Sequence, residues 1–396
     1  MDFNYQDVRT RFVELYKEEP LLVRSPARIN LIGEHTDYND GFVMPAAIDK
    51  EIVFGITVSP DNISRIYSLN FQEGVEVNLA NPEKLQSPRW VNYLLGVIRK
   101  LQDSGHVLKP FNCVLGGNIP TGSGVSSSAA LECGFVYALN ELNALNLPKI
   151  DMIKIAQWSE HNYAGVKCGI MDQFASMMGK KDHVFVLDCR SLEYHYFPIV
   201  LKGYTLVLLD TNVKHSLADS EYNTRRKECE QGVALLKKYY PSISSLRDAT
   251  PAMLKEHQSE FSPVVFNRCS YIVSENLRVE GASKDLANGD IIGFGAKMNE
   301  THEGLSKLYE VSCKELDFLA EEAKAHPAVL GARMMGGGFG GCTINIVKSD
   351  EIEAFTSQLR KDYMNAFNIE LKSYIVKVND GSSLVAATLK NVSHAQ

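Results

Sequence analysis

The chain has 396 residues, of which 45% are hydrophobic, and its formal net charge is −7 with a pI near 5.9. This length and apolar content suffice for packed domains and exclude a disordered or fibrous protein. The acidic balance excludes the basic surface of a nucleic-acid binder, and no apolar run approaches the roughly 20 residues that a membrane-spanning helix needs.

The first elements expected along the chain are strands, at Val23–Ile32, Phe42–Ile48 and Ile52–Val58. The tripeptide Asn39-Asp40-Gly41 predicts a hairpin turn between the first two of them. The beginning of the chain is therefore expected to belong to a sheet.

The connection after the first strand is polar. Arg28 is followed, across a short apolar stretch, by Glu34, His35 and Asp37. Carboxylates accept hydrogen bonds from neighbouring hydroxyls while arginine and histidine donate, so these residues suit a small polyhydroxylated ligand. A polar loop beside a hairpin is the structural alternative. Metal ligation is also conceivable, but no second cluster in the sequence completes a ligand set.

A glycine- and serine-rich loop follows the strand-like run Phe111–Leu115 and leads directly into a helix expected at Ala129–Leu145. The loop reads G-S-G-V-S-S-S from Gly122 to Ser128. Free amides and the positive end of the helix dipole favour an anion there. A simple turn with a serine N-cap is the alternative. The loop is not a Walker A motif, and the protein-kinase motifs H-R-D and D-F-G are absent from the sequence.

A second helix is expected from Asp151 to about Tyr163, ending at Gly165. Asp172 then precedes a short helix-like stretch, Gln173–Met178, in an otherwise apolar setting where a lone charge is costly. An aspartate in this place is either an N-cap or a catalytic carboxylate.

A domain boundary is expected near residue 200, between strand-like runs at Val184–Leu187 and Leu206–Leu209. The composition predicts an α+β fold with two domains, 1–200 and 201–396, and a functional cleft between them. The elements expected in the second half are helices at Glu221–Tyr239, Phe266–Val273 and Glu303–Ala325, and strands at Cys342–Val347 and Ser373–Val378.

The run from Gly336 to Gly341 matches the spacing G-x-G-x-x-G, but the strand-like Cys342–Val347 follows it where a dinucleotide fingerprint needs a helix. A Rossmann site is therefore not expected. So many glycines indicate a close approach to the backbone by another loop, a phosphate or a tight packing turn.

The N-terminal residues M-D-F-N-Y-Q lack the basic and apolar regions of a signal peptide. The eight cysteines are scattered singly from Cys113 to Cys342, without C-x-x-C pairs. These features predict reduced thiols in a cytoplasmic protein that binds neither membrane nor nucleic acid. No obligate protein partner is expected.

Three motifs resemble those of the GHMP small-molecule kinases, in the order found in that family. The G-E-H-T-D-Y-N form of the first is similar to the galactokinase branch rather than to mevalonate or homoserine kinases. The motifs are R-S-P-A-R-I-N-L-I-G-E-H-T-D-Y-N-D-G-F-V-M-P-A-A-I-D (24–49), P-T-G-S-G-V-S-S-S-A-A-L-E (120–132) and M-G-G-G-F-G-G-C-T-I (335–344), with W-V-N-Y (90–93), E-H-N-Y-A-G-V-K-C-G-I-M-D-Q-F (160–174) and S-E-Y (220–222) between them.

The resemblance implies a two-domain kinase with its active site in the interdomain cleft, which transfers the γ-phosphoryl group of ATP to O1 of D-galactose. It places Arg28 and Asp172 beside the anomeric hydroxyl as the catalytic pair. The residues implied in sugar binding are Glu34, His35, Asp37, Gly169 and Tyr222.

For the nucleotide, the resemblance implies that the loop residues Gly122, Ser123, Gly124, Val125, Ser126, Ser127 and Ser128 cradle the ATP phosphates. Trp90 would lie near the adenine, and Ser127 with Glu160 would hold Mg²⁺. The third motif would brace the phosphate loop from the second domain. Val125 stands where the family often has leucine, a change expected to alter packing rather than phosphate contacts.

Phosphoryl transfer of this kind depends mostly on alignment and charge neutralisation. A neighbouring arginine makes a carboxylate a weaker base, so Asp172 is expected to orient the hydroxyl and to accept its proton late. Two alternatives stay open at this point. One is a kinase of the same family for N-acetylgalactosamine or another sugar, and the other is a galactose- and ATP-binding sensor without turnover.

Overall fold

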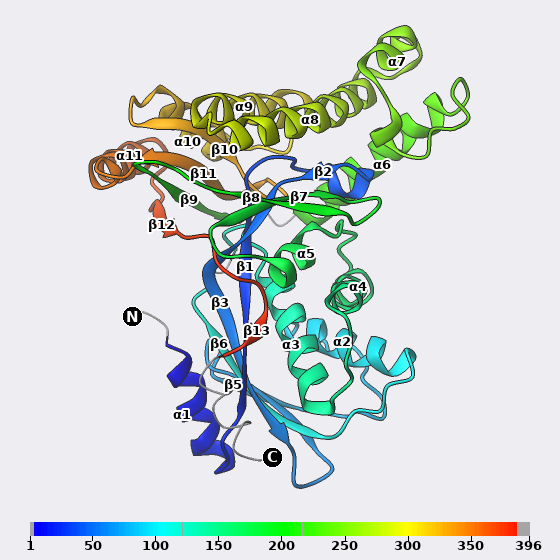
Figure 1. Ribbon diagram of the computed structural model, residues 1–396, viewed down its shortest axis with the longest axis vertical. Helices are drawn as coiled ribbons and strands as arrows, with labels where there is room; N and C mark the ends of the chain where they lie inside the picture. Colours follow the sequence, from blue (N-terminus) through cyan, green and yellow to red (C-terminus); the bar gives the residue numbers. More distant parts are fainter. Residues whose placement is uncertain (1–3, 121, 215–217, 386–396) are drawn as a thin grey trace.

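The computed structural model describes residues 4–120, 122–214 and 218–385. Its largest sheet, in the lower half of Figure 1, has the strand order β13–β1–β3–β6–β4–β5. The strands β1 and β3 pair antiparallel from Leu21↔Ile56 to Asn30↔Pro45. The six strands are β1 (Leu21–Asn30), β3 (Pro45–Val58), β4 (Ser64–Ser68), β5 (Glu73–Val77), β6 (Phe111–Gly117) and β13 (Ser383–Leu384).

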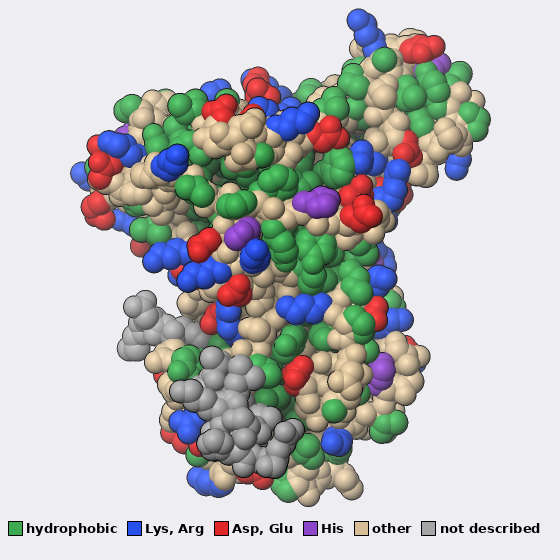
Figure 2. All heavy atoms as spheres, in the orientation of Figure 1, with side chains coloured by type: hydrophobic (Ala, Val, Ile, Leu, Met, Phe, Trp, Pro, Cys, Tyr) green, Lys and Arg blue, Asp and Glu red, His purple; other side chains and the backbone are tan. Residues whose placement is uncertain are grey.

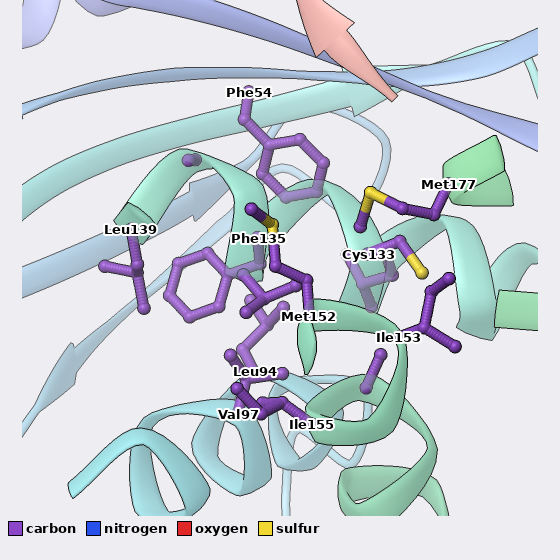
Figure 3. Close-up of a cluster of buried hydrophobic side chains, with 14 of the residues drawn as sticks. Phe54, Leu94, Val97, Cys133, Phe135, Leu139, Met152, Ile153, Ile155 and Met177 are labelled. Carbon is purple, nitrogen blue, oxygen red and sulfur yellow. The ribbon is translucent and has the colours of Figure 1, made fainter. Parts of the chain in front are cut away.

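Helices cover both faces of this sheet. On one face, Phe54 of β3 packs against Phe135, with ring centroids 6.4 Å apart, and Leu139 and side chains from three further helices belong to the same core (Figure 3). The other face is covered by α1 (Tyr5–Tyr16), whose Val8 and Phe12 are fully buried. The helices of the first face are α2 (Val91–Asp103), α3 (Ser127–Asn143), α4 (Lys149–Ser159) and α5 (Met171–Met178).

The upper half of Figure 1 contains a four-stranded antiparallel sheet in the order β10–β11–β9–β12. Along β9, Val207 and Leu209 face the helices α10 and α11, while Leu206 and Leu208 face a second core. That second core includes Ile29 of β1, so it joins the two halves of the molecule. The strands are β9 (Tyr204–Lys214), β10 (Val329–Met334), β11 (Gly340–Lys348) and β12 (Lys372–Val376), and the helices around them are α8 (Pro263–Asn288), α9 (Ile291–Gly304), α10 (Lys314–Ala325) and α11 (Ile352–Phe367).

Smaller elements complete the fold. A three-stranded sheet has the order β2–β7–β8, and a helical arm projects at the upper right of Figure 1. On the face shown in Figure 2, acidic and basic side chains are interspersed over both halves. The elements are β2 (Phe42–Val43), β7 (His183–Asp188) and β8 (Tyr194–Pro198) in the sheet, α6 (Ala218–Leu236), η3 (Leu246–Asp248), α7 (Pro251–Glu256) and η4 (Gln258–Glu260) in the arm, and the short helices η1 (Asp37–Asn39), η2 (Glu160–Ala164) and η5 (Leu305–Tyr309).

Most expected elements are present, with three differences. The strands expected at Phe42–Ile48 and Ile52–Val58 are instead a two-residue β2 and a continuous β3 that includes residues 49–51. The turn at Asn39-Asp40-Gly41 does not join paired strands, because η1 occupies it and β2 pairs with β7 while β1 pairs with β3. The helix expected at Glu303–Ala325 is interrupted: Glu310 adopts φ 52°, and the loop after it bonds through the Val311 carbonyl to the Phe339 amide at 2.7 Å. Tertiary contact with the third glycine motif therefore overrides helical periodicity there.

The C-terminal end of the described chain returns to the first sheet. Leu384 of β13 pairs with Val23, and the Lys149 ammonium donates to the Ser382 carbonyl at 3.2 Å. The domain boundary near residue 200 stays a prediction, since segments of the second half lie in both sheets. All eight cysteines are free thiols. Within the described residues, no helix is long and apolar enough to cross a membrane.

Candidate active site

A cavity of about 390 Å³ lies where β1, the glycine-serine loop, α5 and the third glycine motif meet. The fold thus brings together residues that the sequence separates by more than half of the chain. Gly169 and Trp90 lie outside the lining of this cleft. The predicted site residues that line it are Arg28, Glu34, His35, Asp37, Gly122–Ser128, Glu160, Asp172 and Tyr222.

Arg28 and Asp172 form a bidentate ion pair at the centre of the cleft. The Arg28 Nε and Nη2 donate to Asp172 Oδ1 and Oδ2 at 2.6 and 3.0 Å, while Nη1 donates to the Gly124 carbonyl at 2.7 Å. Asp172 also accepts from Ser126 Oγ at 2.5 Å. The carboxylate lies in the first turn of α5, whose N-cap is Ile170, so the N-cap alternative for Asp172 is wrong.

The glycine-serine loop has the geometry of an anion site. Gly122 and Gly124 adopt φ 81° and 75°, which permits the loop to turn its amides toward the cleft. Ser126 precedes α3 in a left-handed conformation, and its side chain caps nothing because it is bonded to Asp172. The first amides of a 17-residue helix therefore remain available, together with its positive dipole end.

The third glycine motif packs on this loop. A Cβ at Gly336 would lie 3.0 Å from the Gly124 carbonyl oxygen, and one at Gly341 would lie 3.4 Å from the Ser123 carbonyl carbon. Val125 is buried in the core that joins the two halves, and its carbonyl accepts from the Arg28 amide at 3.1 Å. The close approach that the glycines indicated is thus an approach to another loop.

Glu34 is held by the second half of the molecule. Its Oε1 accepts from Arg333 Nη2 at 3.0 Å and from the Gly336 amide at 2.8 Å. Arg333 is wholly buried and also donates to the carbonyls of Asn30, Leu31 and Met334. A buried charge is tolerated here because every arm of the guanidinium has an acceptor.

His35 adopts φ 63° and is 2% exposed. Its Nδ1 is 2.8 Å from Tyr38 Oη, while Nε2 is buried with no hydrogen-bond partner among the residues the structure describes. Burial, followed by the charge of Arg225, lowers the pKa of His35 to about 3. The backbone of Gly337 acts in the opposite direction on this pKa without offsetting the decrease, so the ring is neutral and one of its nitrogens is enclosed without a hydrogen-bond partner.

Asp37 is a second carboxyl with an unusual environment. Burial is the main cause, and the charge of Asp172 the next, of a rise in the pKa of Asp37 to about 7. A Cβ at Gly169 would lie 2.1 Å from Asp37 Oδ2, so glycine is required there to leave space for this carboxyl. Gly169 therefore contributes to the cleft through Asp37 rather than by lining it.

Tyr222 of α6 lies at the open side of the same group. Its ring centroid is 5.3 Å from that of His35 and 5.2 Å from that of Tyr38. A Cβ at Gly337 would lie 3.5 Å from the Tyr222 ring. The tyrosine thus gives the cleft an aromatic wall.

Glu160 lies beside the start of α3, in a group of carboxyls. Its Oε1 accepts from Ser128 Oγ at 2.8 Å and its Oε2 from Gln173 Nε2 at 2.6 Å. Burial, then the charge of Asp172, raises the pKa of Glu160 to about 7. Glu132 next to it is fully buried, and its Oε1 has no hydrogen-bond partner within the described part of the chain. Ser128, not Ser127, bonds Glu160, whereas Ser127 is exposed in the cleft.

A smaller cavity of about 160 Å³ opens beside the main cleft and shares Tyr93, Ser127 and Ser128 with it. Its wall includes Phe71 and Trp90, whose rings stack with centroids 5.8 Å apart. The Trp90 indole donates to Glu73 at 2.6 Å. The cavity is a largely apolar pocket next to the anion loop, and its lining suits a flat aromatic ring.

Sequence reasoning missed several residues that organise the cleft. Arg333 could have been noticed as a single charge in the apolar strand V-L-G-A-R-M. No local pattern marks Tyr309, Arg225 or Gln173, because their contacts come from segments far apart in the chain.

Three family models match the chain. The GHMP kinases N terminal domain matches residues 92–180, the Galactokinase galactose-binding signature residues 10–58, and the GHMP kinases C terminal domain residues 282–365.

Similar proteins cover nearly the whole chain. A galactokinase of Thermotoga neapolitana is 42% identical over 359 residues, which is 91% of this chain and 98% of the relative. One from Clostridium perfringens is 41% identical over 379 residues, or 94% and 98%. The crystal structure of Lactococcus lactis galactokinase complexed with galactose superposes with a TM-score of 0.92 at 34% identity, covering 96% of this chain and 99% of that one. The Methanococcus jannaschii mevalonate kinase shares the fold alone, with a TM-score of 0.62 at 16% identity, over 92% and 100% of the two chains.

Proposed function

Because the chain belongs to the galactokinases of the GHMP kinase family and is thus an ATP-dependent sugar kinase, we propose that the γ-phosphoryl group of ATP passes to O1 of D-galactose beside Asp172. One observation carries this proposal. Asp172 is bonded both to Arg28 of β1 and to Ser126 of the anion loop. The carboxylate therefore lies where a sugar and a triphosphate would meet.

On the sugar side, the cleft supplies groups that match hydroxyls. His35 Nε2 has no hydrogen-bond partner among the described residues, the buried Asp37 lines the cleft, and Tyr222 forms an aromatic wall beside His35. Glu34 is fixed by Arg333 and the Gly336 amide, so it enters the sugar site in a preset orientation. Such preorganisation reduces the entropy lost on binding.

On the nucleotide side, the amides of Gly122–Ser128 and the N-terminus of α3 would receive the phosphates. The pocket next to Ser127 and Ser128, with Trp90 in its wall, would receive the adenine. This arrangement directs the terminal phosphate toward Asp172, because Ser126 joins the loop to that carboxylate.

Magnesium fits the residues present. The described chain holds no group of three or more metal-ligating His, Cys, Asp or Glu side chains, so these side chains alone do not complete a coordination shell. Mg²⁺ instead prefers one or two carboxylates together with phosphate oxygens and water. Glu160 lies near two other carboxyls, Glu132 and Asp172, and accepts a hydrogen bond from the Ser128 hydroxyl. We assign Glu160 and Ser127 to it, with Ser128 orienting Glu160; when bound, the ion neutralises phosphate charge.

In the reaction itself, Arg28 neutralises charge on the transferred group and holds Asp172 in one orientation through two hydrogen bonds. Three donors hold the Asp172 carboxylate in place, which suits a group that orients the hydroxyl and takes its proton late. The free thiols of the chain fit a reducing compartment, and we propose the cytoplasm.

The test is ADP release from magnesium-ATP with and without D-galactose, in the native protein and in Asp172→Ala. Galactose-dependent release that disappears in the variant is expected. A panel with N-acetylgalactosamine at fixed ATP measures the sugar preference. Galactose binding without any ADP release would contradict the proposal, and so would release that is independent of the sugar.

A further inference from the structure

A chain of hydrogen bonds leads from His35 out of the cleft and into the helical arm. His35 Nδ1 is 2.8 Å from Tyr38 Oη, which is 2.7 Å from Tyr309 Oη. Tyr309 Oη is in turn 3.2 Å from Cys229 Sγ of α6. We call these three partners, Tyr38, Tyr309 and Cys229, the His35 relay.

The relay is shielded from water at its far end. Tyr309 is fully buried and Cys229 is 1% exposed. Rings pack around the chain, with the Tyr309 centroid 5.0 Å from His35 and 4.8 Å from Tyr271. Each polar hydrogen in the relay must therefore find its acceptor within the chain, because an unmade hydrogen bond in such surroundings is costly.

Both ends of the relay have a defined protonation state. His35 is neutral, since burial and the charge of Arg225 lower its pKa, so it carries one N–H. Cys229 is a thiol, since burial raises its pKa to about 12, so it carries one S–H. The three links then contain one proton each, and all of them point either toward His35 or away from it.

The two directions have opposite consequences. If the protons point toward His35, the thiol donates to Tyr309, Tyr309 to Tyr38 and Tyr38 to Nδ1, which leaves the ring proton on Nε2. If they point away, Nδ1 donates to Tyr38 and the thiol hydrogen must find another acceptor. Besides Tyr309, the side-chain amide of Asn39 bonds to Cys229, and it lowers the pKa of this thiol as a donor to sulfur does, so it gives the thiol hydrogen no acceptor. The first direction uses every proton of the relay.

The cleft also needs a donor at this place. Glu34, Asp37 and Asp172 supply acceptor oxygens around the sugar site. The Arg28 donors described above already bond to Asp172 and to the Gly124 carbonyl. A hydroxyl that donates to one of these carboxylates turns its oxygen lone pairs toward the remaining wall, which includes His35, whose buried Nε2 has no hydrogen-bond partner among the described residues.

We propose that Cys229, Tyr309 and Tyr38 are positioning residues that keep the single proton of His35 on Nε2, so that His35 donates a hydrogen bond to a hydroxyl oxygen of the sugar. This deepens the sugar site and rests on the proposed function. The helical arm, through Cys229, therefore contributes to selectivity for a sugar that places a hydroxyl oxygen next to His35 Nε2.

The direct test is ¹⁵N NMR of the histidine side chains in the intact protein, free and with D-galactose. The signals of His35, one of ten histidines, are assigned by their loss in His35→Gln. We expect Nε2 to resonate as a protonated nitrogen and Nδ1 as an unprotonated one. A proton on Nδ1 in the native protein would overturn the proposal, whether or not any variant folds.

Variants test the role of the relay. Tyr38→Phe removes the donor to Nδ1 and should mix the two tautomers, with galactose bound about three- to tenfold more weakly, the loss of one hydrogen bond. Cys229→Ser keeps a donor and should preserve both the tautomer and the affinity. Tyr240→Phe is the matched control, since it removes a hydroxyl that bonds only Glu256 on the arm surface. Unchanged His35 signals in Tyr38→Phe would refute the relay.

The outcomes separate the two proposals. The NMR experiment needs no turnover, so a proton on Nδ1 would leave the kinase reaction untouched. Absence of galactose-dependent ADP release would instead remove the proposed function and leave the tautomer still measurable. A set of monodeoxy and deoxyfluoro galactoses adds a check, because fluorine accepts a hydrogen bond but does not donate one. At the contacted position, the native protein should bind the fluoro sugar more tightly than the deoxy sugar, and Tyr38→Phe should not.

Discussion

Individual side chains in the cleft are placed by partners from distant segments, and Asp172 shows this most clearly. Its two oxygens accept from Arg28 and Ser126, which come from β1 and from the start of α3. A carboxylate that is held from two sides cannot rotate freely, so the direction of its lone pairs is set before the sugar arrives. Removing its charge should therefore affect turnover more than binding.

We expect Asp172→Asn to lower kcat at least about 100-fold, since a positioned carboxylate typically contributes that much to proton transfer, while galactose affinity changes less than about tenfold. Single-turnover ADP release and calorimetric galactose binding measure the two quantities. Asp61→Asn, which changes a carboxylate paired with Arg65 far from the cleft, is the control and should retain activity. Native turnover in Asp172→Asn would contradict the assigned role.

The stability of the ligand-free protein should also depend on Asp37. Its pKa is raised from 3.8 to about 7, so the folded state holds the proton through a pH range in which the unfolded chain has lost it. The contribution of this group to the free energy of unfolding therefore falls as the pH rises through that window, and the full cost is present above it.

Asp37→Asn should consequently gain stability over the native protein as the pH is raised from 4 to 8, by about 4 kcal/mol across the range, while it binds galactose more weakly. Urea unfolding at a series of pH values measures the difference between the two proteins. If the two proteins differ in free energy of unfolding by the same amount at every pH, ionisation of the buried Asp37 carboxyl does not destabilise the fold.

At the scale of elements, the site depends on backbones that approach one another closely. Gly169, in the loop before α5, leaves space for the carboxyl of Asp37, which follows β1. Gly336, after β10, lies against Gly124 of the anion loop. These approaches fix the distance between the sugar side and the phosphate side of the cleft.

Gly169→Ala should raise the KM for galactose about tenfold or more with a smaller effect on kcat, because the added Cβ would lie 2.1 Å from Asp37 Oδ2 and must displace it. Steady-state kinetics at saturating ATP measure both constants. Gly74→Ala on β5 is the control, since its Cβ would meet only the Tyr67 ring, at 3.2 Å, and the Ile66 carbonyl, at 3.5 Å. An unchanged KM in Gly169→Ala would show that Asp37 can shift without loss.

The sequence allowed prediction of these elements where local pattern decides them. The helix at Ser127–Asn143, the end of the next helical segment at Gly165 and the strand at Gly340–Lys348 follow from apolar spacing and glycine positions. The break at Glu310 and the pairing of β2 with β7 did not follow, because contacts with distant segments decide them. The same division applies to the cleft: its motif residues were found, while Arg333 and the His35 relay were not.

At the scale of the whole molecule, a single buried guanidinium connects the two halves. Arg333 of β10 donates to carbonyls at the end of β1 and to Glu34 in the sugar site. Neither side of this ion pair is exposed by more than 2%. Loss of one partner leaves the other charge buried without compensation, which is more costly than loss of both.

Arg333→Met should lower the free energy of unfolding by about 3–5 kcal/mol, and the double variant Arg333→Met/Glu34→Gln should recover part of that loss. Urea denaturation of the four proteins of this cycle measures the coupling. Arg360→Met, which removes an exposed guanidinium bonded to Ser373, should cost far less. Additive effects in the cycle would mean that Arg333 acts only through its main-chain contacts.

The return of β13 to the edge of β1 has a consequence for biosynthesis. Val23 leaves the ribosome early, whereas its partner Leu384 leaves only after all the other described elements. Throughout translation the outer edge of β1 is therefore unpaired, a state in which a strand readily joins another chain. Nascent chains of this protein should be a client for chaperones that shield strand edges, and the first sheet should reach full protection from hydrogen exchange only once the synthesis of residue 384 is complete.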